Sequence, residues 1–103
     1  MSAKPDSLRV ARRVCRILAL LKGHSIDGVA LSDLARALDE PVTTTLRALE
    51  AMAEEDAVKK LENGRWALSM LSLRIHASHA TEITRAESRI ADLKQGVAAG
   101  AHY

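Results

Sequence analysis

Apolar residues recur every three or four positions through the first quarter of the chain, which predicts an amphipathic helix. We expect it to start at Ser7, a favourable N-cap, and to end before Gly23. Three faces separate on the helical period: a core stripe of Val10, Val14, Ile17, Leu18 and Leu21, a stripe of Leu8, Ala11, Cys15 and Ala19, and a polar face of Arg9, Arg12, Arg13 and Arg16. Two apolar stripes are typical of a helix that packs on its own domain and on a partner, so we predict dimerisation through Leu8, Ala11 and Cys15.

Two shorter helical patterns follow, separated by a tight polar turn. Residues 29–31 predict a short strand, and the first of these helices is expected to begin with Ser32 as N-cap. Asp39, Glu40 and Pro41 form the predicted turn. The inward positions are expected to be Leu34, Ala35 and Leu38 in the first helix, and Val42, Leu46, Leu49 and Ala53 in the second, with Thr45 and Met52 beside them.

A β-hairpin comes next, because Asn63-Gly64 lies between the strand-like runs 58–61 and 66–68. Helix, helix, turn, helix and hairpin is the order of a winged helix-turn-helix. We therefore predict a mainly α fold: an N-terminal arm (residues 1–6), three helices plus a β-hairpin wing (7–68), a long C-terminal helix (69–95) and a flexible tail (96–103).

The C-terminal helix carries a short heptad pattern. Whether it is continuous or broken at residues 78–81 stays open. With Ile83 and Ile90 at a and Ala86 and Leu93 at d, the pattern predicts oligomerisation through Ile83, Ile90 and Leu93. A parallel pair would place Glu82 against Glu87, and Arg89 against Lys94, which is repulsive. Antiparallel pairing, packing onto the first helix and closure of the chain's own core all stay open.

Charge is unevenly distributed along the 103 residues, although the net value is only +2. Residues 1–22 carry +5, residues 23–57 carry −6 and residues 58–103 carry +3. This asymmetry allows a basic face for DNA and argues against a non-specific coat protein. The pattern contains no secretory signal, no apolar run long enough for a membrane span and only one cysteine, so we expect a cytoplasmic protein.

The candidate chemistry is that of duplex-DNA contact. Major-groove reading requires side chains at the start of the inserted helix, which predicts Thr43, Thr44 and Arg47 as base-reading residues. The predicted contacts to the DNA backbone are Lys59, Lys60, Asn63 and Arg65 in the hairpin and Arg12 and Arg13 in the first helix. The plainer alternatives are helix-capping threonines, an Arg47 paired with Glu50 or Glu54, and an ordinary solvated hairpin and arginine face.

His76 and His79 lie one turn apart, with Glu82 one turn further, which is a weak pattern for a metal site. Surface histidines are the more common explanation, so we predict no metal and no cofactor. No nucleophile–base set or phosphate-binding loop occurs, and the sequence therefore predicts a protein that is not an enzyme.

The segments SLRVARRVCRILALL and VALSDLARALDEPVTTTLRALEAMAEEDAVKKLENGRWAL resemble the N-terminal DNA-binding domain of IclR-family bacterial transcription regulators. The resemblance covers residues 7–70. It implies that Thr43, Thr44 and Arg47 read DNA, that Arg65 belongs to the wing, and that the first and last helices dimerise. Asp39 and Asp56 replace the family's usual glycines, Val42 replaces a polar residue, and the effector-binding domain is absent.

These features predict a sequence-specific transcriptional regulator that binds duplex DNA as a dimer, in the form of a stand-alone bacterial or phage-encoded module. One alternative is a winged-helix adaptor that binds or inhibits a host protein. The second alternative is a metal-responsive repressor.

Overall fold

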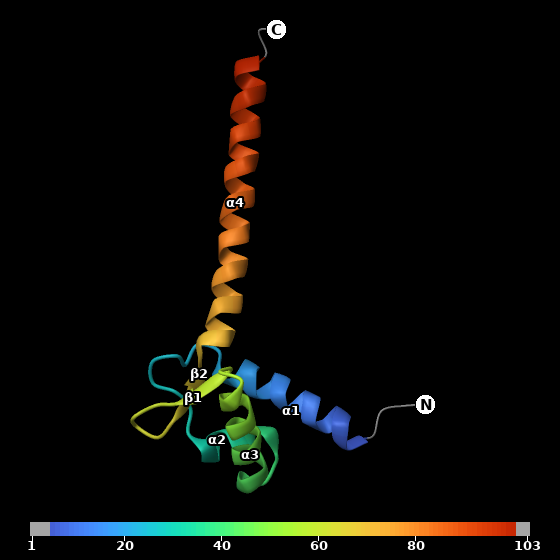
Figure 1. The fold of residues 1–103 in the computed structure, drawn as a ribbon, viewed down its shortest axis with the longest axis vertical. Coiled ribbons are helices and arrows are strands. Elements are labelled where there is room, and N and C mark those ends of the chain that lie inside the picture. Colours follow the sequence, from blue (N-terminus) through green and yellow to red (C-terminus); the bar gives the residue numbers. More distant parts are fainter. Residues whose placement is uncertain (1–4, 101–103) are drawn as a thin grey trace. The chain divides into compact units, whose positions relative to one another are not determined.

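A computed structural model describes residues 5–100 of the chain, and the side chains from residue 7 onward (Figure 1). The elements are α1 (Pro5–Leu21), α2 (Leu31–Leu38), α3 (Val42–Glu54), β1 (Val58–Lys60), β2 (Trp66–Leu68) and α4 (Met70–Gly100). The fold is mainly helical, with a small antiparallel sheet and a long C-terminal helix, as predicted. Contacts divide it into two units, residues 5–73 and 74–100 of the described part, which we describe separately.

The start of α1 differs from the prediction, because the helix begins at Pro5 instead of at Ser7. Proline is favourable in a first helical turn, where its missing N–H has no intrahelical acceptor anyway. The predicted N-terminal arm is therefore at least two residues too long, and its residues 1–4 lie outside the described residues.

The core of the first unit lies where α1, α2, α3 and the hairpin meet. Its buried members are Ile17, Leu21, Leu34, Leu38, Leu49, Met52, Val58 and Trp66. Two predicted core positions are wrong, since Val10 and Val42 are half exposed. Val10 lies beside an open groove between α1 and α3, and Val42 is the first residue of α3, next to the turn. Periodicity therefore identified the correct face of each helix but not how far along it the packing extends.

The start of α2 also corrects a prediction. Ala30, and not Ser32, is the N-cap, and no side chain caps the helix. Ala30 has extended backbone angles and follows Val29, whose backbone N–H and C=O pair with Trp66 at 2.8 and 2.9 Å. The predicted strand at 29–31 is thus confirmed only as a single bridge at Val29, and α2 begins two residues earlier than predicted.

The hairpin pairs β1 with β2 in antiparallel register, with Val58 opposite Leu68 and Lys60 opposite Trp66. At its tip, the Gly64 N–H donates to the Leu61 carbonyl at 2.9 Å, and Gly64 has a φ of 84°. A turn followed by a left-handed glycine matches the right-handed twist of paired strands. The Asn63-Gly64 signal therefore predicted the hairpin correctly.

Gly28 brings the loop before α2 against this hairpin. A Cβ at this position would lie 2.9 Å from the Trp66 carbonyl oxygen, and the residue has a φ of 73°. Only glycine combines this conformation with so close an approach.

Helix α4 begins against the first unit. The Ser69 hydroxyl donates to the Asp56 carboxylate at 2.7 Å, the Leu71 N–H donates to the Asp56 carbonyl at 3.0 Å, and the Ser72 hydroxyl donates to the Ala57 carbonyl at 2.9 Å. Asp56 itself has a φ of 61°, a conformation that aspartate tolerates better than most residues.

The helix then continues to Gly100 without the break considered for residues 78–81, and the predicted tail is helical over residues 96–100. The hydroxyls of Thr81 and Thr84 donate to the carbonyls one turn earlier, so both are accommodated inside the helix. A single glycine costs about 1 kcal/mol inside a helix and does not end it at Gly96. No residue of α4 is buried. None of the helices in residues 5–100 has the length and apolar character that crossing a membrane requires.

Candidate nucleic-acid interface

The N-terminal half of α3 presents a polar face with one long cation. Thr43 and Arg47 lie one turn apart and are exposed. Arg47 forms no ion pair with Glu50, Glu54 or any other residue of the described part of the chain. The guanidinium is therefore available to an external partner, and the alternative in which Arg47 is neutralised on its own helix does not apply.

The other two threonines of this segment have different surroundings. Thr45 is fully buried, and its hydroxyl donates to the Pro41 carbonyl at 3.0 Å, which secures the first turn of α3. Thr44 is half buried and lines the groove between α1 and α3 together with Val10 and Val14. Of the predicted base-reading residues, Thr43 and Arg47 are exposed, and Arg47 also borders the groove that Thr44 lines.

The hairpin supplies a second set of cations. Lys59 and Lys60 are exposed on β1, and Arg65 is exposed just before β2. Asn63, predicted as a DNA contact, has its amide group engaged within the domain. Its Nδ2 donates to the Asp27 carbonyl at 3.1 Å, and its Oδ1 accepts from the Arg65 N–H at 2.9 Å. Asn63 therefore ties the hairpin tip to the loop before α2 and orders the backbone at Arg65.

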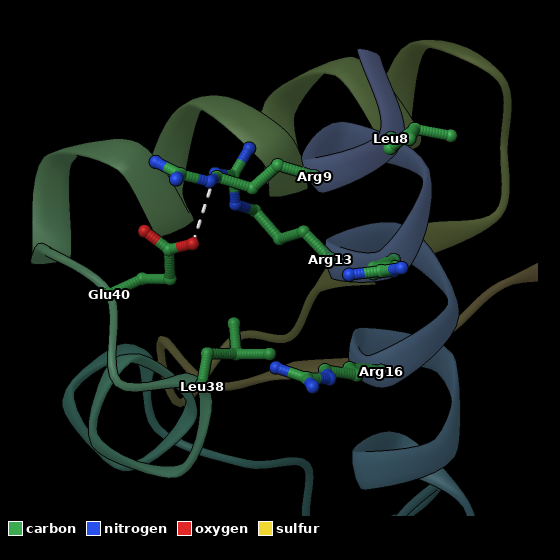
Figure 2. A pocket seen from close by; sticks show the side chains of 7 residues that line it. Leu8, Arg9, Arg13, Arg16, Leu38 and Glu40 are labelled. Atoms are coloured by element: carbon green, nitrogen blue, oxygen red, sulfur yellow. Dashed lines mark hydrogen bonds and ion pairs between the residues drawn. The ribbon is translucent and has the colours of Figure 1, made fainter. Parts of the chain in front are cut away.

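The arginine face of α1 borders a hollow of about 350 Å³ (Figure 2). Its lining consists of Leu8, Arg9, Arg12, Arg13, Arg16, Leu38 and Glu40. Arg13 is directed inward, where its guanidinium donates to the Glu40 carboxylate at 3.1 Å. The side chain of Arg13 is only 11% exposed and that of Glu40 only 21%. Arg13 thus fastens α1 to the turn before α3, while Arg9, Arg12 and Arg16 remain exposed.

Sequence reasoning missed the Arg13–Glu40 pair and the contribution of Arg9 and Arg16 to this hollow. The pair joins residues 27 positions apart, and no local pattern identifies which of four equivalent arginines is directed inward. The arginines at positions 9 and 16 were visible as members of the same helix face, and that face was the available signal.

Figure 1 shows how the elements that carry these cations lie around α3. In this view the hairpin extends to one side of α3, and α1 extends to the other. The second half of α3 and its C-cap are acidic, with exposed Glu50 and Glu54 in the helix and exposed Glu55 as the C-cap. The N-terminal half of α3, which carries the cation Arg47, therefore lies between two basic elements, the hairpin and α1.

The predicted dimerisation residues are exposed in both units. Leu8, Ala11 and Cys15 lie on the surface of α1, and Ile83, Ile90 and Leu93 lie on the surface of α4. His76 and His79 are also exposed, and within residues 5–100 no three histidine, cysteine or carboxylate side chains gather as a metal site would require.

Comparison of the chain with protein-family models, with curated proteins and with solved structures finds no match. The resemblance to IclR-family regulators therefore stays a prediction, and the functional argument depends on the geometry alone.

Proposed function

We propose that residues 5–73 form a winged helix-turn-helix that binds duplex DNA, with the N-terminal half of α3 in the major groove. The observation that carries this proposal is the exposed, unpaired Arg47 one turn after Thr43 on the outer face of α3. Arginine pairs bidentately with guanine, and threonine contacts either a phosphate or the methyl group of thymine. The acidic Glu50 and Glu54 keep the second half of α3 away from the phosphates.

The elements on either side of α3 hold the DNA backbone in this proposal. Lys59, Lys60 and Arg65 contact phosphates from the wing, and Arg9, Arg12 and Arg16 contact them from α1. Such contacts set position and affinity without reading sequence. Arg13 and Asn63 have structural roles instead, because both are engaged inside the domain.

The resulting activity is sequence-specific binding by a transcriptional regulator that acts as a dimer on a palindromic operator. Dimeric helix-turn-helix proteins place two recognition helices about one helical turn of DNA apart, so the operator symmetry follows the protein symmetry. A dimer also doubles the number of phosphates neutralised, which a domain of low net charge needs for useful affinity.

Binding measured by fluorescence anisotropy on a cognate and a random duplex tests the division of roles. Arg47→Ala removes a base contact and should weaken cognate binding by about 1–3 kcal/mol while leaving random binding nearly unchanged. Arg65→Ala removes a phosphate contact, so it should weaken binding to both duplexes alike. It should also reduce the slope of log K against log salt concentration by about one. Equal losses on both duplexes for both variants would contradict the assignment. Arg47→Lys, which keeps the charge but loses the bidentate geometry, is the matched control.

A second candidate is a protein-binding adaptor, favoured by an open groove between α1 and α3. The groove walls include the apolar side chains of Val10, Val14, Ala48, Ala51 and Met52. An apolar interface in this groove would bind its partner with little salt dependence, whereas DNA binding weakens steeply as salt rises. Val10→Asn, which makes the groove polar without placing a negative charge near Arg47, should abolish adaptor binding and leave DNA binding intact.

A further inference from the structure

The part of α4 beyond its first turn is a long helix with a line of exposed apolar side chains. No residue of this helix is buried, and residues 74–100 form a unit of their own. Ile83, Ile90 and Leu93 are 48%, 53% and 69% exposed, and Val97 is 73% exposed. Ala86 completes the line, whose members are separated by three or four positions. We call these five residues the α4 seam.

Such a helix requires a partner. A helix in a protein gains most of its stability from the packing of an amphipathic face, because isolated helices are marginal in water. Alternating spacings of three and four residues keep the apolar line facing one partner helix, as in a coiled coil. A broad apolar stripe suited to a globular core would need additional positions, and the neighbouring side chains of the α4 seam are charged.

The charged residues beside the seam decide how that partner is oriented. One edge carries Glu82 and Arg89, and the other carries Glu87 and Lys94. All four are exposed, and none forms an ion pair within residues 5–100. In a parallel pair the two kinds of edge face each other, so acid meets acid and base meets base. In an antiparallel pair each edge faces the same edge of the second helix, so Glu82 meets Arg89 of the other copy, and Glu87 meets its Lys94.

We infer that α4 is the dimerisation surface of this protein, and that a second copy binds along the α4 seam in antiparallel orientation. The apolar layers and the charged edges together fix the register: Ile83 packs on Leu93 of the second copy, and Ala86 packs on Ile90. In this register the two-fold axis lies near residue 88, and the four pairs of opposite charge lie beside the apolar layers. Two Glu82–Arg89 pairs and two Glu87–Lys94 pairs then lie beside one apolar seam.

This inference deepens the proposed dimer but does not depend on DNA binding, because its tests contain no DNA. The first test is sedimentation equilibrium of the full chain, with three charge variants. Glu82→Arg and Arg89→Glu each turn two attractive pairs into repulsive ones, so each should weaken the dimer by roughly tenfold. The double variant Glu82→Arg/Arg89→Glu restores opposite charges and should return the dissociation constant to within about threefold of the original.

The same variants give the opposite result for a parallel dimer. There, Glu82→Arg would face Glu87 and Arg89→Glu would face Lys94, so each single variant would tighten association. Tighter single variants, unchanged ones or an original protein that stays monomeric at tens of micromolar would each overturn the inference. Asp92→Arg makes the same charge change as Glu82→Arg but lies away from the seam, and should leave association unchanged. Trp66 fluorescence confirms that residues 5–73 stay folded in every variant, because Trp66 is buried there.

A distance measurement provides a test that is independent of charge. Ala99 is exposed near the end of α4, and a spin label can be attached to Ala99→Cys once the exposed Cys15 is replaced by serine. In the antiparallel register the two labels lie 22 residues apart along the helix axis, or roughly 33 Å at 1.5 Å per residue. A separation of roughly 10–20 Å, set by the spacing of two side-by-side helices and the labels themselves, would show a parallel dimer and overturn the inference.

Discussion

Residues 5–73 and residues 74–100 are both rich in helix and in aliphatic side chains, yet only the first unit buries them. Three helices and a hairpin bury eight apolar side chains in one core, whereas α4 buries none. The same heptad-like spacing that places Ile17 and Leu21 inside the first unit leaves Ile83 and Ile90 exposed. Periodicity identifies an apolar face, and the presence of a neighbouring element decides whether that face is a core or an interface.

The two units should differ most in how the free energy of unfolding responds when one aliphatic side chain is shortened in each. Leu49 is fully buried, so Leu49→Ala should lower the free energy of unfolding by about 2–5 kcal/mol. Ile90→Ala, which shortens an exposed side chain, should change the unfolding of residues 5–73 by less than about 0.5 kcal/mol. Urea denaturation followed by Trp66 fluorescence measures both. Similar losses in the two variants would mean that α4 shares the core of the first unit.

An intermediate effect is expected where the first unit uses a charge internally. Arg13→Ala removes the pair with Glu40 and leaves that carboxylate mostly buried, which should cost about 1–3 kcal/mol. Arg12→Ala, one residue earlier on the exposed part of the same face, should cost less than about 0.5 kcal/mol. Thermal unfolding of both variants provides the test. A destabilisation by Arg12→Ala as large as that by Arg13→Ala would refute the structural role of Arg13.

The smallest effect concerns the residue just before α4, which lies within the first unit. Ser69→Ala removes the hydroxyl that donates to Asp56 at 2.7 Å, and should cost about 1 kcal/mol. A double-mutant cycle with Asp56→Asn isolates this bond from the φ of 61° that Asp56 must keep. A coupling energy near zero would show that the first turn of α4 is held by the Leu71 N–H and the Ser72 hydroxyl, without a contribution from Ser69.

Much of the fold follows from local pattern, because its signals are short-ranged. The order of the elements, the hairpin at Asn63-Gly64 and the inward placement of Leu34 and Leu49 needed only periodicity and turn chemistry. The burial of positions at the ends of a packed region could not be predicted from local pattern. The exposure of Val10 and Val42 depends on where a neighbouring helix ends.

The candidate site was predictable only in part, for the same reason. The exposed Thr43 and Arg47 occupy the positions that helical geometry assigns to them. The inward Arg13 and the hairpin-bound Asn63 depend on partners 27 and 36 residues away, which no local pattern reveals. A charged or amide side chain on a predicted outer face can therefore serve the fold instead of the ligand.

Base reading by α3 is tested most directly by selection from a pool of random duplex DNA with the 103-residue chain at about 150 mM salt, followed by sequencing of the retained fraction. We expect enrichment of a palindromic motif, and loss of that enrichment with Arg47→Ala while Trp66 fluorescence stays unchanged. If folded protein enriches no motif, base reading by α3 is contradicted. A motif that Arg47→Ala selects equally well would contradict it too.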